Sequence, residues 1–206
     1  MAFPLRVFAA TSNAGKLREF ALAAAAYPEL EIAPLPGFRG IVPAEETGLT
    51  FEDNARLKAL HYGAYSSDLV FAEDSGLEVA ALGGVPGVYS ARFAGEGATD
   101  AANNALLLEQ LAGAGNRSAR FVCVIALAWR GQVLATFEGW VEGFIAEAPQ
   151  GDHGFGYDPL FFHPPSGCTT AQLSPEAKLA ISHRGAAFRQ MLFWLHTHAP
   201  SLDDRA

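Results

Sequence analysis

A long hairpin dominates the second half of the sequence. Two predicted strands, Arg120–Trp129 and Val133–Ile145, are joined by the tight turn Arg130-Gly131-Gln132. The first half instead alternates strands with helices and begins with the short apolar strand Leu5–Ala10. A chain that mixes strand–helix units with a long hairpin favours a mixed, twisted sheet flanked by helices, of the α/β class.

The remaining elements follow from periodicity and from helix-start signals. A helix follows the turn Thr11-Ser12-Asn13 and ends before Pro28, and Thr50 with Asp53 resembles a capping box. Further helices are predicted at Phe51–Tyr65, from Thr99 through Leu111 and at Arg184–His196. A short helix before the last one is predicted to start at Ser174-Pro175. Further strands are predicted at Leu69–Ala72 and Leu77–Leu82. Residues 34–48 and 149–170 are rich in Pro and Gly and predict loops, and residues 199–206 predict a frayed tail.

Composition narrows the class of protein. The 206 residues fit a single domain, 1–206, and half of them are hydrophobic. The net charge of -8, without a long basic run, argues against a nucleic-acid partner. No basic leader and no apolar stretch of about 20 residues is present, so neither a signal peptide nor a membrane anchor is expected and the predicted location is the cytoplasm. An acidic chain that binds phosphate must gather its few cations at the site or use a metal.

The turn Thr11, Ser12, Asn13, Ala14, Gly15, Lys16 is the first candidate site. It connects a strand to a helix start, where backbone N–H groups and the helix dipole favour an anion. It is not a P-loop, because the first glycine is absent and Leu17 follows Lys16. From this turn alone, an ordinary capped helix with a solvated lysine is the favoured interpretation.

Two acidic pairs form the second candidate. Glu73 and Asp74 follow the predicted strand Leu69–Ala72, where two neighbouring carboxylates repel each other and lose hydration. A bound Mg²⁺ would relieve both problems, and Glu45 or Glu46 in the preceding loop could complete its ligands. The alternative, that the acidic residues only cap a turn, is equally compatible with this segment.

The third and fourth candidates are aromatic and basic. In the glycine-rich segment at 151–159, Phe155 or Tyr157 could stack on a base, although aromatics between glycines more often pack in a core. Lys178 and Arg184 are donors that suit a 6-keto purine and reject the amino group of adenine, and His183 lies beside Arg184 at the start of the next helix. Taken singly, these three are more often solvated helix ends or caps.

One further pair lies on the predicted helix Phe51–Tyr65. Asn54 and Lys58 are four residues apart and share a face, so Lys58 could reach a triphosphate. A solvated lysine is the favoured interpretation.

Seven short motifs, taken in order, resemble the inosine-triphosphate pyrophosphatase family, also called XTP/dITP diphosphatases. They are Thr-Ser-Asn-Ala-Gly-Lys at 11–16, Ala-Glu-Glu-Thr-Gly at 44–48, Phe-Glu-Asp-Asn-Ala-Arg-Leu-Lys-Ala at 51–59, Glu-Asp-Ser-Gly-Leu at 73–77, Pro-Gly-Val-Tyr-Ser-Ala-Arg-Phe-Ala-Gly at 86–95, Gly-Phe-Gly-Tyr-Asp-Pro at 154–159 and Ser-His-Arg at 182–184. The resemblance implies an elongated sheet in two lobes with a central substrate cleft, and a homodimer. It also implies the reaction, in which ITP, dITP or XTP and water give the monophosphate and pyrophosphate.

The resemblance assigns roles to matching positions. Asp74 corresponds to the catalytic carboxylate that binds Mg²⁺, with Glu46, or less favoured Glu45, as a second ligand. The implied substrate contacts are Thr11, Ser12, Asn13, Ala14, Gly15, Lys16, Ser75, Phe155, Gly156, Tyr157, Asp158, Lys178, His183 and Arg184. Two departures stand out: Glu73 replaces an Asp of some relatives, and Gln172 replaces a frequent Glu. The rival hypotheses are a nucleotide sensor without turnover and a pyrophosphatase for other modified nucleotides.

Overall fold

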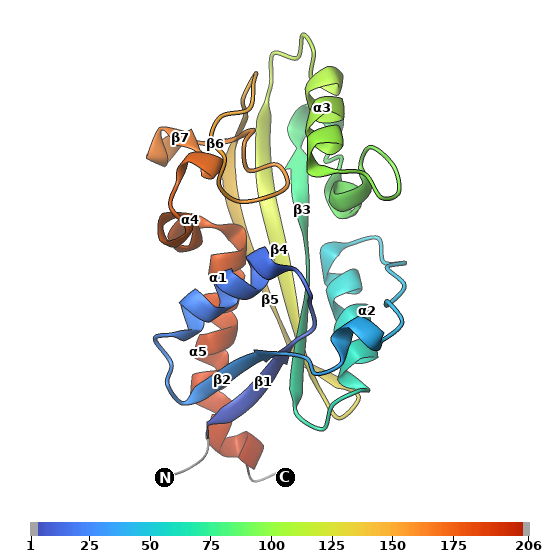
Figure 1. Ribbon diagram of the computed structural model, residues 1–206, viewed down its shortest axis with the longest axis vertical. Helices are drawn as coiled ribbons and strands as arrows, with labels where there is room; N and C mark the ends of the chain where they lie inside the picture. The colour runs from blue at the N-terminus through green and yellow to red at the C-terminus, as the bar shows by residue number, and fades with distance from the viewer. Residues whose placement is uncertain (1–3, 204–206) are drawn as a thin grey trace.

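A seven-stranded mixed sheet forms the centre of the molecule (Figure 1). The computed structural model describes residues 4–203, with side chains described for residues 4–198. Within that range the strand order is β2-β1-β3-β4-β5-β6-β7. The strands are β1 Leu5–Ala9, β2 Leu30–Pro34, β3 Leu69–Val79, β4 Ser118–Trp129, β5 Gln132–Ile145, β6 Phe161–His163 and β7 Cys168–Thr169. The predicted mixed sheet flanked by helices is confirmed.

Five α-helices and several short 3₁₀ turns surround the sheet in the described part of the chain. The helices are α1 Ala14–Ala24, α2 Phe51–Gly63, α3 Asp100–Gln110, α4 Pro175–Ile181 and α5 His183–Asp203. The 3₁₀ turns are η1 Phe38–Gly40, η2 Ala80–Leu82, η3 Gly87–Arg92, η4 Pro164–Ser166 and η5 Thr170–Gln172. No helix in this part of the chain combines the length and the apolar character needed to cross a bilayer.

The hairpin β4–β5 is the longest antiparallel pairing, and β3 extends it on the other side of β4 (Figure 1). Arg130 and Gly131 form its connection, both with positive φ, as a two-residue turn that matches the strand twist requires. Gln132, expected in the turn, is the first residue of β5. At the other end of the sheet, β1 pairs in parallel with both β2 and β3.

Successive residues of each strand contribute side chains to hydrophobic cores on opposite faces of the sheet, because side chains alternate between the two faces. On one face, α5 and α1 bury a cluster around Phe20, Phe71, Ile125 and Phe188. On the other face α2 covers small side chains, including Val122, Val124, Ala126 and Ala128 of β4. The longest axis of the molecule runs roughly along β3, β4 and β5 (Figure 1).

Several element boundaries differ from the prediction. The expected strands Leu69–Ala72 and Leu77–Leu82 are one strand, β3, because β4 pairs with it continuously from Val70 to Val79. Residues 80–82 form η2 instead. Strand β2 was not expected, and neither were β6 and β7, which lie in the predicted loop 149–170.

The C-terminal helix is also longer than predicted. Helix α5 begins at His183 rather than Arg184 and extends beyond the expected end at His196. The predicted frayed tail, residues 199–206, is wrong for residues 199–203, whose backbone belongs to α5, while residues 204–206 lie outside the described residues.

Candidate active site

Strand β3 places two adjacent carboxylates in different surroundings. Glu73 points toward α1 and α5, whereas Asp74 points toward α2, as the alternation of a strand requires. Both are buried, with 6% and 7% of their surface exposed. The prediction that these residues follow the end of a strand is wrong, since β3 continues to Val79.

The partner of β3 on its other edge ends close to these carboxylates. Strand β1 pairs with β3 only from Val7 to Ala9, the last pair being Ala9 with Phe71. One further backbone bond joins Ala10 to Phe71, and the chain then leaves the sheet as the turn 11–13. At Glu73 the edge of β3 therefore meets Lys16 of the predicted phosphate-binding turn instead of another strand, and from Leu77 onward it bonds to residues 85–90.

Glu73 is the centre of a buried network of ion pairs. Its carboxylate contacts Lys16 Nζ at 2.5 Å and Arg184 Nε at 2.7 Å. Arg184 also donates to Ser75 Oγ at 3.1 Å. Burial opposes ionisation of Glu73, but Arg184 and Lys16 together hold its pKa well below its usual range. Glu73 is thus an anion near neutral pH that pairs with two cations.

The turn at 11–16 has the local structure expected of a helix start. Asn13 caps α1, its side-chain oxygen accepting from the backbone N–H groups of Gly15 and Lys16 at 2.8 and 3.1 Å. Thr11 accepts from the N–H of Asn13 in turn, and Ser12 is exposed. Gly15 lies against the ring of Phe155, where a Cβ atom would come within 3.0 Å of two ring carbons.

Most predicted substrate contacts line a single cavity of about 210 Å³. The predicted residues that line it are Asn13, Lys16, Ser75, Phe155, Gly156, Tyr157, Asp158, Lys178, His183 and Arg184. Thr11, Ser12, Ala14 and Gly15 lie in the adjoining turn and are not among the lining residues. Residues from β3, the 151–159 segment, α4 and α5 thus converge, which sequence spacing alone does not establish.

The aromatic face in this cavity belongs to Phe155. Lys178 Nζ lies 4.7 Å and Arg184 Cζ lies 5.4 Å from the centre of its ring. Tyr157 is buried and donates its hydroxyl to the carbonyl of Ser90 at 2.9 Å, within a hydrophobic cluster. The ring of Phe155 therefore lines the cavity beside two cations, while Tyr157 anchors the segment, and stacking of Phe155 on a base stays a prediction.

Asp158 holds the aromatic segment together. Its carboxylate accepts from the N–H of Phe155 at 2.9 Å, from Thr170 Oγ1 at 2.9 Å and from Lys178 Nζ at 2.5 Å. Gly156 is fixed from α3, since Asp100 accepts its N–H at 2.7 Å. Contact of Asp158 with a base stays a prediction, and its visible role is to orient Phe155 and Lys178.

His183 contributes a neutral, unpaired ring nitrogen. Its ring stacks on Phe121 with centroids 4.8 Å apart. Burial and the neighbouring Arg184 hold the pKa of His183 well below its usual range. Its Nδ1 atom is buried without a hydrogen-bond partner among the described residues. A buried, unpaired polar atom beside a cavity is costly without a ligand and suits a polar contact to one.

On the α2 side of β3, Lys58 joins two carboxylates. Its Nζ lies 2.6 Å from Asp74 Oδ1 and 3.2 Å from Glu46 Oε1. Asn54 donates to the second Asp74 oxygen at 3.3 Å. Burial raises the pKa of Asp74, and the charge of Lys58 only partly offsets it. Glu45, by contrast, is exposed.

The acidic pair fits a hard divalent cation in part. Among the described residues no group of three or more potential metal ligands is present. Asp74 and Glu46 nevertheless converge on one ammonium group, so their oxygens already share a single cationic partner. Mg²⁺ commonly takes one or two carboxylates and completes its shell with phosphate oxygens and water. The donor set therefore fits Mg²⁺ held jointly with a phosphate ligand.

Sequence patterns missed several residues of the site. The favoured interpretation of Lys58 as solvated is wrong, as is that of Lys178 and Arg184, which are buried. Glu19 was not singled out, although it pairs with both Lys178 and Arg184. The i,i+4 spacing of Asn54 and Lys58 was the available signal for that pair.

Gln172 caps η5 through the N–H of Thr169, a bond that needs no charge.

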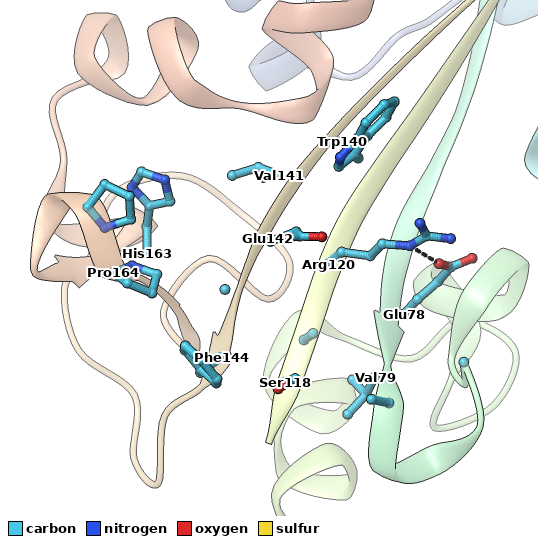
Figure 2. A pocket seen from close by; sticks show the side chains of 15 residues that line it. Glu78, Val79, Ser118, Arg120, Trp140, Val141, Glu142, Phe144, His163 and Pro164 are labelled. Atoms are coloured by element: carbon cyan, nitrogen blue, oxygen red, sulfur yellow. Dashed lines mark hydrogen bonds and ion pairs between the residues drawn. The ribbon is translucent and has the colours of Figure 1, made fainter. Parts of the chain in front are cut away.

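A larger groove, of about 870 Å³, lies on the surface of the hairpin (Figure 2) and shares no lining residue with the cavity. Trp140 and Phe144 of β5 line it and are 55% and 46% exposed. Arg120 is paired there with Glu78 (Figure 2). Among the described residues that line this groove, Arg120 is the only Lys or Arg, and it is already paired, so they do not supply the cations that a triphosphate requires.

Comparisons with known proteins point in one direction. The sequence model of the Ham1 family matches residues 7–194. A dITP/XTP pyrophosphatase of Acidobacterium capsulatum is 49% identical over 197 residues, covering 91% of this chain and 97% of the relative. One from Bordetella pertussis is 48% identical, covering 95% and 93%. The solved structure of a HAM1 protein from Coxiella burnetii matches with a TM-score of 0.85 and 42% identity, covering 94% and 99%.

Proposed function

The chain belongs to the Ham1 family, and from this premise we propose that it hydrolyses non-standard purine nucleoside triphosphates to the monophosphate and pyrophosphate. The relatives named dITP/XTP pyrophosphatases cover nearly the whole chain at almost half identity. The substrates are ITP, dITP and XTP, and their removal keeps such bases out of DNA and RNA.

One observation carries the assignment. The cation-lined cavity and the Asp74–Lys58–Glu46 group lie on the two sides of β3, where pairing with β1 has ended. A nucleotide can therefore lie in a cleft across this open edge, with its base in the cavity and its phosphates near Asp74. Lys16 lines the cavity and lies beside Glu73 at this edge, so its ammonium group suits the phosphates.

Base selection follows from the donors of the cavity. Lys178 and Arg184 offer only N–H donors, and Phe155 offers a flat apolar face. A purine with a 6-keto group presents an acceptor to those donors, whereas adenine presents an amino donor that would remain unpaired. The unpaired Nδ1 of neutral His183 adds a second polar contact.

Asp74 is the proposed base. Its raised pKa and its hydrogen bonds from Lys58 and Asn54 suit a carboxylate that orients a water molecule and accepts its proton. Lys58 positions Asp74 against Glu46, and Lys16 offsets negative charge on the departing pyrophosphate. When bound by Asp74 and Glu46, Mg²⁺ would polarise the phosphate oxygens and neutralise developing charge.

Two alternatives involve the same pocket. A sensor without turnover would not need the buried Asp74–Lys58–Glu46 group, which the chain retains. A pyrophosphatase for other modified nucleotides would keep this group but use a different set of bases.

We also propose a homodimer that works in the cytoplasm, where nucleotide pools are found. The groove of Figure 2 suits a second copy, because a two-fold interface presents the same patch twice. Exposed Trp140 and Phe144 supply apolar area, and Arg120 beside Glu78 and Glu142 lets unlike charges meet. A sedimentation mass equal to one chain at micromolar concentration would contradict this.

Pyrophosphate release from ITP, XTP, dITP, ATP and GTP, with Mg²⁺ and with EDTA, tests the function. We expect magnesium-dependent release from the first three and little from ATP, and GTP, which shares the 6-keto group, tests whether a 2-amino group is also excluded. ITP binding without release from any substrate would favour the sensor. Equal release from ATP would contradict the base selection.

A further inference from the structure

Glu19 is a buried carboxylate that touches two cavity cations without lining the cavity itself. It lies on α1 and is 7% exposed. Its Oε1 contacts Lys178 Nζ at 3.2 Å, and its Oε2 contacts Arg184 NH1 at 2.9 Å. Lys178 and Arg184 line the cavity, whereas Glu19 lies behind them. Any effect of Glu19 on a ligand must therefore pass through the charge and position of these two side chains.

Formal charges in this buried group balance. Three cations, Lys16, Lys178 and Arg184, are linked by the ion pairs described above to three carboxylates, Glu19, Glu73 and Asp158. Charges so far from water interact strongly, because little solvent screens them. Asp100 adds a further carboxylate to the cavity lining. Loss of the charge of Glu19 would take one carboxylate partner from both Lys178 and Arg184, and it would make the surroundings of the base cavity more positive by one unit.

Such a charge matters because the expected bases differ in acidity. Xanthine carries two carbonyl groups and gives up a ring proton more readily than hypoxanthine, which carries one. Near neutral pH the xanthine ring is therefore the more negative of the two. More positive surroundings would favour xanthine, whereas the carboxylate of Glu19 beside Lys178 and Arg184 lets the cavity accept both rings.

We propose that Glu19 is a positioning residue that sets the base preference, by balancing Lys178 and Arg184 so that neutral and anionic keto-purines are both accepted. This rests on the proposed function, since it concerns the same cavity. In this role Glu19 controls the ratio of the affinities for xanthine and hypoxanthine nucleotides, not the rate of hydrolysis.

The test is the variant Glu19→Gln, which keeps the shape of the side chain and removes its charge. Calorimetric binding of XMP and IMP supplies a readout independent of turnover, and kcat/KM for XTP and ITP supplies a second. We expect the ratio of the affinities for XMP and IMP to rise by about tenfold, which is the change in an equilibrium constant that corresponds to one pKa unit. Glu19→Asp, which keeps the charge, should leave the ratio near that of the native protein.

The exposed Glu31, paired with Arg6 on the surface, is the matched control, and Glu31→Gln should leave the ratio unchanged. An unchanged ratio in folded Glu19→Gln, or an equal change in Glu19→Asp, would overturn the proposal. If Glu19→Gln does not fold, the affinities of the native protein for XMP and IMP test the proposal. Affinities for XMP and IMP within about tenfold of each other support charge balance, and a larger preference for XMP contradicts it. A shifted binding ratio in a protein without pyrophosphate release would refute the proposed function and leave Glu19's role standing.

Discussion

Adjacent residues of β3 show how strongly position alone changes a carboxyl group. Glu73 lies between Lys16 and Arg184, and its pKa is held well below the usual range. Asp74, one residue further, is desolvated with fewer compensating charges, and its pKa is raised. A low pKa suits a fixed anion, and a raised one suits a base, so the two side chains are matched to different tasks.

Replacing Asp74 by Asn should remove turnover without unfolding the protein. We expect kcat to fall by about two to four orders of magnitude, the usual contribution of a general base. The free energy of unfolding should change by less than about 1 kcal/mol, because Lys58 keeps Glu46 as a partner. Steady-state kinetics with ITP and urea denaturation measure the two effects. Asp68→Asn, at an exposed acidic residue, is the control, and near-native kcat in Asp74→Asn would refute the role.

Which residues could be identified from the sequence depended on whether their signal was local. The turn at 11–16 could be predicted because it lies between a recognisable strand and a recognisable helix, and Asn13 caps α1. Glu19 carries no such signal, because only tertiary packing buries it beside cations from other elements. The spacing of Lys58 and Asn54 shows that they share a helix face, but not that Lys58 meets the carboxylates of Asp74 and Glu46. The ordered motifs, rather than any single one, supplied the role of Asp74.

Among the elements, α5 depends on one glycine of β5 for its close approach to the sheet. A Cβ atom on Gly139 would lie 2.3 Å from the carbonyl oxygen of His183 and 2.6 Å from the amide nitrogen of Ala187. Both atoms belong to the backbone of α5, which cannot rotate away as a side chain can. Gly139 therefore positions the first turn of α5, which carries His183 and Arg184 into the cavity.

The variant Gly139→Ala should displace that first turn. We expect a loss of about 1–3 kcal/mol in the free energy of unfolding, as for other overpacked sites. KM for ITP should rise more than kcat falls, since the change affects base contacts and spares Asp74. Gly115→Ala, where a Cβ meets nothing within 4 Å, is the control for the substitution itself. Unaltered stability and KM would mean that α5 does not need this contact.

The same scale shows what a sequence pattern misses in a strand. Gly76 and the charges at 73 and 74 interrupt the apolar run, which is why two strands were predicted where β3 is one. Pairing with β4 along ten residues outweighs the low strand propensity of these positions. The hairpin β4–β5 was predictable because its apolar pattern and its Arg-Gly turn agree.

For the whole molecule, buried titratable groups link stability to pH. The pKa of His183 lies well below its ordinary value of 6.5 in the folded chain, so below that pH the unfolded chain binds a proton that the folded chain does not. Glu73 acts in the same direction at lower pH, since its lowered pKa contributes stability that is lost as pH falls below 4.5. Both groups make the folded state less stable in acid.

We therefore expect the free energy of unfolding to decrease as the pH falls from 7 to 5, by at most about 1.4 kcal/mol per pH unit for His183. Urea denaturation at several pH values measures the slope. His183→Gln should flatten it in this range, while His153→Gln, at an exposed histidine, should not. A slope that is the same in all three proteins would show that His183 is charged in the folded state.

The opposite orientation of Glu73 and Asp74 has a consequence for how the gene can change. A substitution in β3 alters one side chain. Insertion or deletion of one residue within β3, before position 73, would instead move every following residue of that strand to the opposite face of the sheet. The two carboxylates would then each meet the other's partners. Lineages of this protein can therefore vary β3 in composition far more freely than in length, and one-codon indels there should be absent from functional copies.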